Sequence, residues 1–129
     1  MKVGHIALWT RKMDEQSAFW ATYFNAQIGE EYVSRNRPGF VSRFVTLTSG
    51  PTIELMSLPE LGDAPDNKEL VGWAHIAITV GDEEDVDQLA QQAKDAGLLR
   101  SLPRHTGDGF YEAVLNDPDG NLIEIIAEQ

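Results

Sequence analysis

The sequence predicts an α+β fold built from two tandem βαβββ modules, and an internal repeat is the first reason. Residues 4–8 (Gly-His-Ile-Ala-Leu) return at 74–78 as Ala-His-Ile-Ala-Ile, and residues 52–56 (Thr-Ile-Glu-Leu-Met) return at 122–126 as Leu-Ile-Glu-Ile-Ile. Both motifs recur at an offset of 70 positions, and a shared offset for two separated motifs indicates a duplicated unit. The second reason is that each half shows the same order of strand-like and helix-like segments.

The first module is predicted to cover about residues 1–58. Its helix is expected over residues 14–25, with Asp14 as the N-cap. Aromatic residues spaced four apart support that helix, namely Phe19 with Tyr23 and Trp20 with Phe24. Strands are expected at about residues 2–9, 27–35, 40–48 and 51–58, and a tight turn at 48–50 joins the last two.

The second module is predicted to cover about residues 73–129, after a linker at 59–72 that is rich in proline and glycine; together the modules form a single domain, 1–129. Its helix is expected at 82–96, with Asp82 as N-cap and Gly97 at its end. The apolar stripe of this helix is Val86, Leu89, Ala90 and Ala93. Strands are expected at about residues 73–80, 98–105, 110–116 and 121–127, and the Asp-Pro-Asp-Gly run at 117–120 predicts a turn between the last two.

Composition excludes several classes of protein. With 129 residues and 42% hydrophobic side chains, the chain has the size of one domain with an ordinary core. The net charge of −11 argues against nucleic-acid binding, and the absence of cysteine excludes disulfides and thiolate metal sites. No apolar run approaches the roughly 20 residues of a membrane span, and the first strand begins too early for a signal peptide. We therefore expect a cytoplasmic protein with no membrane partner.

Strand alternation predicts where the polar residues of the repeat point. His5 and Trp9 share one face of the first strand, and Glu54 lies opposite to its aliphatic neighbours on a later strand. His75 and Glu124 repeat this pattern in the second module. If the aliphatic faces pack under the helices, His and Glu project from the concave face of a curved sheet.

These four residues are the predicted ligands of one divalent metal ion: His5, Glu54, His75 and Glu124. A bare carboxylate inside an apolar strand costs several kcal/mol to desolvate, and a cation offsets that cost. Two imidazoles and two carboxylates suit Zn²⁺ or Ni²⁺ first, with Co²⁺, Mn²⁺ and Fe²⁺ as alternatives. The other interpretation is a hydrogen-bonded His–Glu pair in each module, inherited by duplication without a retained metal site.

The sequence resembles the vicinal oxygen chelate superfamily, also called the glyoxalase/bleomycin resistance/extradiol dioxygenase group. The resemblance covers essentially the whole chain and rests on four motifs: His-Ile-Ala at 5–7, Ile-Glu-Leu at 53–55, His-Ile-Ala at 75–77, and Asp-Pro-Asp-Gly-Asn-Leu-Ile-Glu at 117–124. It implies that the two modules form a curved eight-stranded cup with the helices outside. It also implies a metal bound by the same four residues, and two His with two Glu is the glyoxalase I set.

The resemblance implies a metal-dependent glyoxalase I-like lyase or isomerase that acts on a thiol adduct of a 2-oxoaldehyde through an enediolate. Glu124 or Glu54 would act as the base, and Glu124 is preferred because similar epimerases carry Gln where Glu54 stands. Two alternatives stay open. One is a metal-dependent epimerase of a 2-substituted acyl thioester, and the other is a drug- or metabolite-binding protein of the bleomycin-resistance kind.

The substrate is expected to be a small molecule, with glutathione or another thiol as cosubstrate. Bacterial glyoxalases place an Arg near the position of Trp9 and an Asn near that of Leu58, and neither is present here. Trp9, Arg43 and Arg104 are therefore the candidate substrate-binding residues. Further arginines near the hairpins are Arg11, Arg35 and Arg37. We also expect a homodimer, because pairing would cover the edges of the sheets.

Overall fold

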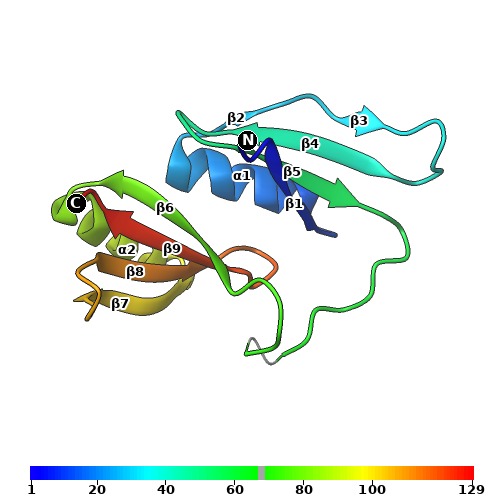
Figure 1. Cartoon of the computed structure of the whole chain (residues 1–129). Coiled ribbons are helices and arrows are strands. Elements are labelled where there is room, and N and C mark those ends of the chain that lie inside the picture. The colour runs from blue at the N-terminus through cyan, green and yellow to red at the C-terminus, as the bar shows by residue number, and fades with distance from the viewer. Residues whose placement is uncertain (67–68) are drawn as a thin grey trace. The chain divides into compact units, whose positions relative to one another are not determined.

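The computed structural model describes residues 1–66 and 69–129, and it has the predicted α+β fold (Figure 1). The chain divides into two compact units, Met1–Ala64 and Pro65–Gln129, which contain module 1 and module 2. In chain order the elements are β1 (His5–Trp9), α1 (Met13–Phe24), β2 (Gln27–Ile28), β3 (Tyr32–Val33), β4 (Val41–Thr46), β5 (Thr52–Ser57), β6 (His75–Gly81), α2 (Glu83–Asp95), β7 (Leu99–His105), β8 (Tyr111–Asn116) and β9 (Leu122–Ala127).

In each module the first strand pairs in parallel with the last strand. The sheet of module 1 has the order β1-β5-β4-β2, with β3 also paired to β4, and the sheet of module 2 has the order β6-β9-β8-β7. β1 runs parallel to β5 and β6 runs parallel to β9, whereas the neighbouring pairs β4–β5 and β8–β9 are antiparallel. The repeat seen in the sequence is therefore a repeat of topology.

The prediction of one continuous strand at residues 27–35 is wrong. Two strands of two residues each, β2 and β3, pair with β4 at separate places, and residues 29–31 lie between them. Gly29 passes so close to β4 that an added Cβ would lie 3.1 Å from the Phe44 carbonyl oxygen, and its own N–H donates to that oxygen. The exposed pair Glu30 and Glu31 follows, and glutamates of this kind are poor strand formers.

The start of α1 also differs from the prediction. Asp14 is not the N-cap; it lies in the first helical turn, where its charge favours the positive end of the helix dipole. The helix begins earlier because Thr10 turns the chain, its hydroxyl accepting a hydrogen bond from the Lys12 N–H, and Gln16 N–H then donates to the Lys12 carbonyl. Lys12 is the N-cap residue, and its side chain makes no capping hydrogen bond.

Aromatic side chains of α1 form the core of module 1. The predicted pairs are confirmed, with ring centroids 5.1 Å apart for Phe19 and Tyr23 and 5.0 Å apart for Trp20 and Phe24. Trp20 is fully buried, and its indole N–H donates to the side chain of buried Gln16 at 3.2 Å. The sheet contributes the buried residues Val45, Ile53 and Leu55 to the same core.

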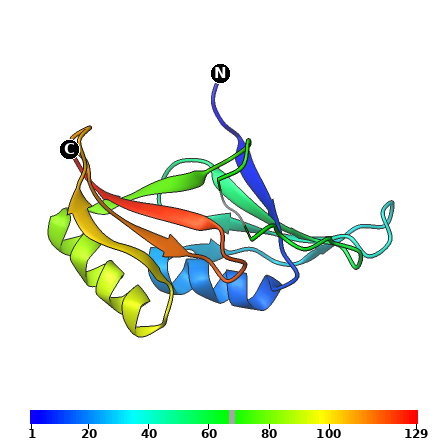
Figure 2. The same cartoon turned by 90° about the horizontal axis from the view of Figure 1, so that it is seen from below.

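Helix α2 lies against one face of the sheet of β6 to β9 (Figure 2), and the core of module 2 lies between them. Asp82 is the N-cap as predicted, and it forms a capping box in which Asp82 and Asp85 each accept the other's backbone N–H. The predicted stripe of α2 is buried at Val86, Ala90 and Ala93, and half-buried at Leu89. No helix among the described residues is long and apolar enough to span a membrane.

Buried Asp117 closes the turn between β8 and β9. Its Oδ1 accepts from the backbone N–H groups of Asp119 and Asn121 at 2.9 and 2.8 Å, and its Oδ2 accepts from the Asn121 side-chain amide at 2.8 Å. We expect Asp117→Ala to lower the free energy of unfolding by about 2–3 kcal/mol, because these donors lose a charged acceptor. Urea denaturation measures the change. The control Asp66→Ala removes an exposed carboxylate and should have little effect, and equal losses in both variants would contradict the role of the turn.

Candidate metal centre

In module 1, β1 and β5 bring His5 and Glu54 together. Ala7 lies opposite Glu54 in the parallel register, and His5 shares the Ala7 face, so both side chains project from the same side of the sheet. The His5 Nε2 atom lies 3.5 Å from Glu54 Oε2. The glutamate side chain is 16% exposed and the histidine 51% exposed, so the carboxylate is the more buried partner.

Module 2 repeats this pair in the same register. Ala77 lies opposite Glu124, and His75 shares the Ala77 face. The His75 Nε2 atom lies 3.6 Å from Glu124 Oε2, and the glutamate side chain is 17% exposed. The duplication has therefore preserved the geometry of the pair as well as its sequence.

The two atoms of each pair are spaced as two ligands of one metal ion would be. With metal–nitrogen and metal–oxygen bonds of about 2.1 Å, neighbouring ligand atoms of a tetrahedral site lie about 3.4 Å apart. The observed 3.5 and 3.6 Å are close to this value and longer than a usual N–H···O hydrogen bond. Within each module, the structure therefore brings two of the four predicted ligands together.

The face of the sheet that carries the pair of module 1 also carries aromatic side chains. Phe44 contacts His5 edge-on, with ring centroids 5.8 Å apart. Trp9, on the His5 face and 43% exposed, packs edge-on against Phe40, and the Arg37 guanidinium lies 5.7 Å from the Trp9 ring centre. The structure therefore places predicted Trp9 on the same face of the sheet as the pair, four residues along β1 from His5, and adds Arg37, which the sequence marked only as one of several hairpin arginines.

Arg43, in contrast, is not brought to the His5–Glu54 face. In the β4–β5 register Arg43 lies opposite Leu55, whose fully buried side chain belongs to the core under α1. Its guanidinium Nη2 lies 3.7 Å from Glu31 Oε2. The sequence suggested Arg43 as a substrate-binding residue only because it lies near a predicted hairpin. The strand register shows that it lies on the opposite face of the sheet from His5 and Glu54.

In module 2, Arg104 lies on the face of the His75–Glu124 pair, where Glu112 holds it. Arg104 Nη2 donates to Glu112 Oε1 at 2.9 Å, and Nη1 donates to the Ser101 hydroxyl at 3.0 Å. The Glu112 side chain is 9% exposed and hydrogen-bonds with the Glu124 side chain. Burial raises the pKa of Glu112, the negative charge of Glu124 raises it further, and Arg104 opposes both effects.

Glu112 was missed by sequence reasoning, although a signal was present. It is a single carboxylate between strand-forming residues of β8, the pattern that drew attention to Glu54 and Glu124. Comparison of the two repeats does not reveal Glu112, because the matching position 70 residues earlier is Ser42.

The raised pKa of Glu112 predicts a pH-dependent stability difference. An ordinary glutamate titrates near pH 4.3, so above that pH the native state holds on to a proton that the unfolded chain has released. The contribution of Glu112 to the free energy of unfolding therefore falls as the pH rises above the pKa of an ordinary glutamate. In the metal-free protein, Glu112→Gln should become more stable relative to the wild type as the pH rises above about 4.3. Urea denaturation with a chelator at several pH values measures this, and a difference that stays constant with pH would contradict it.

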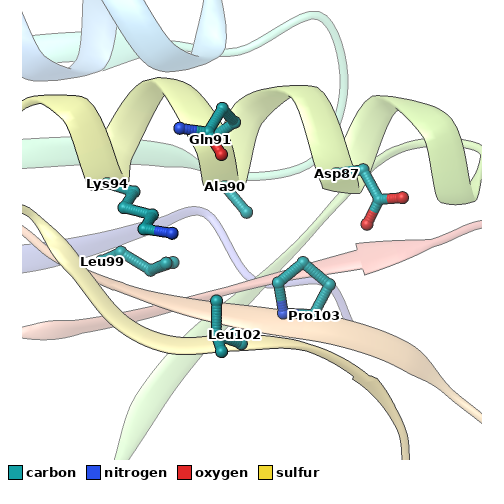
Figure 3. Close-up of a pocket in the computed structure, with 7 residues that line it drawn as sticks. All are labelled: Asp87, Ala90, Gln91, Lys94, Leu99, Leu102 and Pro103. Carbon is teal, nitrogen blue, oxygen red and sulfur yellow. The ribbon is translucent and has the colours of Figure 1, made fainter.

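A groove of module 2 lies apart from the His75–Glu124 pair. This groove, of about 190 Å³, lies between α2 and β7, with Asp87, Lys94 and Leu102 among its lining residues (Figure 3). It opens on the side of the sheet that α2 covers, whereas His75 and Glu124 lie on the other side.

Comparison with known proteins identifies the family. The sequence profile of the Glyoxalase/Bleomycin resistance protein/Dioxygenase superfamily matches residues 2–125, which is nearly the whole chain. The chain belongs to this superfamily.

Solved structures of superfamily proteins share the fold. A glyoxylase/bleomycin resistance protein/dioxygenase domain from Frankia sp. EAN1pec aligns with a TM-score of 0.83 at 16% identity, over 100% of this chain and 98% of that one. Glyoxalase I from Zea mays aligns with a TM-score of 0.79 at 20% identity, over 99% of this chain but 46% of the maize chain. A fosfomycin resistance protein from Listeria monocytogenes, complexed with Mn(II) and sulfate, gives 0.73 at 22% identity, over 98% of this chain and 92% of that one.

Proposed function

We propose that this protein is a metal-dependent glyoxalase-like lyase or isomerase that acts on a thiol adduct of a 2-oxoaldehyde. The observation that carries the proposal is the repeated His–Glu pair, at 3.5 Å in module 1 and 3.6 Å in module 2, in the same register. In the proposed assembly the two modules form the curved cup of the family, and the ligands are His5, Glu54, His75 and Glu124.

Charge and burial support a divalent ion at these residues. Two carboxylates that are each about one-sixth exposed would be costly to keep ionised without a compensating cation. Two neutral imidazoles and two carboxylates neutralise a divalent charge, and this donor set suits Zn²⁺ or Ni²⁺, with Co²⁺, Mn²⁺ and Fe²⁺ as alternatives. The Mn(II) complex of the Listeria relative supports metal binding on this fold.

Each residue at the proposed centre would then have a separate role in the reaction. The bound cation supplies Lewis acidity, which stabilises negative charge developing on the two neighbouring substrate oxygens. Glu124 acts as the general base that takes the proton from the carbon beside the carbonyl group and returns it to the adjacent carbon. His5 and His75 stay neutral and hold the centre, and Glu54 remains a ligand.

The substrate-facing residues suit a small molecule with an anionic group. Trp9 offers a half-exposed ring on the same face as His5, and the Arg37 guanidinium lies over that ring. Arg104 keeps half of its side chain exposed on the face of His75. Glutathione, or another thiol that carries an anionic group, would fit this description. We also propose a homodimer, because pairing would cover exposed strand edges.

Elemental analysis together with a substrate panel tests the proposal. We expect about one divalent transition metal ion per chain, and turnover of the adduct of methylglyoxal with glutathione or another thiol. A 2-substituted acyl thioester should be included, because an epimerase would use the same base and the same cation. A protein that binds a drug without metal, and turns over none of these compounds, would contradict the proposal.

A further inference from the structure

We propose that Glu112 is a positioning residue that orients the carboxylate of Glu124, and that Arg104 holds Glu112 in place. This inference rests on the proposed function, since Glu124 is a ligand and the base there. It adds a residue that neither the repeat nor the predicted ligand set contains.

The strand register places Glu112 on the face of the His75–Glu124 pair. On β8, Glu112 lies opposite Ile126, and Val114 lies opposite Glu124, so the carboxylates of Glu112 and Glu124 are diagonal neighbours on adjacent strands. The two side chains hydrogen-bond with each other. The neighbouring residues Ala113 and Leu115 point the other way, into the core under α2.

Arg104 and Ser101 fix the outer end of this arrangement. Arg104 lies opposite Glu112 in the β7–β8 register and donates to its Oε1 at 2.9 Å, while its second nitrogen donates to Ser101 at 3.0 Å. The Glu112 side chain is only 9% exposed, so water has little access to it and the contacts to Arg104 and Glu124 define its position. The chain Ser101–Arg104–Glu112–Glu124 thus runs across three adjacent strands to the proposed ligand.

Module 1 carries no carboxylate at the corresponding place. The positions 70 residues earlier than Glu112 and Arg104 are Ser42 and Ser34, which are too short to form the same chain. The two glutamates of the repeat are therefore inequivalent: both have an imidazole neighbour, and Glu124 has the buried carboxyl group of Glu112 in addition. A ligand whose orientation is fixed before binding loses less freedom when the ion arrives, so the support should appear in metal affinity.

The test compares Glu112→Met with Glu112→Gln. Methionine keeps the length of the side chain and removes its polar atoms, whereas glutamine keeps an acceptor for Arg104 and gains N–H donors for Glu124. We expect the Met variant to bind Co²⁺ about 10–100-fold more weakly than the wild type, which is the usual loss when a hydrogen-bond partner of a ligand is removed. The Gln variant should bind within about threefold of the wild type, because its amide restores the contact.

The measurement is competition for Co²⁺ with a chromophoric chelator, paired with thermal unfolding of each metal-free protein. Glu128→Met, at an exposed position, is the matched control and should leave affinity unchanged. Arg104→Met keeps Glu112 and should also weaken binding, so it tests the inference even if Glu112→Met fails to fold. Equal affinity in Glu112→Met and the wild type, or equal loss in the Met and Gln variants, overturns the inference.

The His75→Ala variant separates a failure of the positioning role of Glu112 from a failure of the metal centre itself. If His75→Ala loses Co²⁺ while Glu112→Met and Arg104→Met do not, the centre stands and Glu112 has no positioning role. If His75→Ala binds Co²⁺ as the wild type does, the proposed centre itself is wrong, and the role of Glu112 falls with it.

Discussion

Replacing His75 by alanine is expected to empty the proposed centre and to lower thermal stability. One neutral nitrogen ligand of four is lost, and the ion binds the folded chain in preference to the unfolded one. At a free metal concentration 100 times the Kd, bound metal adds about 2.7 kcal/mol to the free energy of unfolding, and the variant should lose most of that contribution. Bound metal is measured by elemental analysis, and stability by thermal unfolding with and without a chelator.

The chain offers a matched control for this substitution. His105 is the third histidine, and its 68% exposed side chain has Nε2 3.9 Å from Glu83 Oε1, outside the His75–Glu124 pair of its own module. His105→Ala should keep the wild-type metal content and the wild-type response to chelator. His5→Ala should behave like His75→Ala, since the two pairs have nearly the same geometry. Full metal content in both His5→Ala and His75→Ala would rule out the four-ligand centre.

The second large effect should separate the base from the other ligand. Glu124→Gln is expected to reduce turnover by about 10²–10⁴-fold while keeping most of the metal, because proton abstraction needs a charged oxygen and coordination needs only a lone pair. Glu54→Gln should reduce turnover much less, because Glu54 is assigned to coordination alone. The measurement is turnover and bound metal for both variants, on whichever thiol adduct the substrate panel shows to be active.

A symmetric result would change the assignment. If both variants lose turnover equally, the glutamates act as an equivalent pair, and the contact between Glu112 and Glu124 has no bearing on the choice of base. If Glu54→Gln alone is inactive, Glu54 of module 1 is the general base. Either result would leave the metal centre intact and correct only the roles inside it.

The order of strands and helices in each module could be predicted from the sequence, because the internal repeat and the alternation of apolar and polar residues along the strands both indicate it. His5, Glu54 and their copies were placed on one face of each sheet from alternation alone, and the register confirms that placement. Local features were predicted less well. Asp14 was assigned as a cap because aspartate favours that position, but a turn at Thr10 starts the helix earlier.

Contacts between strands explain the errors at the candidate site. Arg43 was chosen for its place near a hairpin, and only its pairing with Leu55 shows that it belongs to the opposite face. Glu112 was overlooked because its importance depends on a diagonal neighbour on β9, which alternation along one strand cannot identify. Residues 67–68 of the predicted linker lie outside the described residues.

The parallel pairing of β1 with β5, and of β6 with β9, also bears on how the chain is made. The sheet of module 1 cannot be completed until Ser57 has been synthesised, because β1 pairs with β5, the last strand of the module. At about 5–20 residues per second, synthesis of the 48 residues from the end of β1 at Trp9 to Ser57 takes several seconds at the slower rates, and β1 has no partner strand during that time. During that time the edge of β1 is available to wrong partners, including the similar first strand of another nascent chain. We therefore expect refolding of isolated fragments that end before residue 52 to give aggregation, whereas a chain that ends at Ala64 contains every strand of its own sheet.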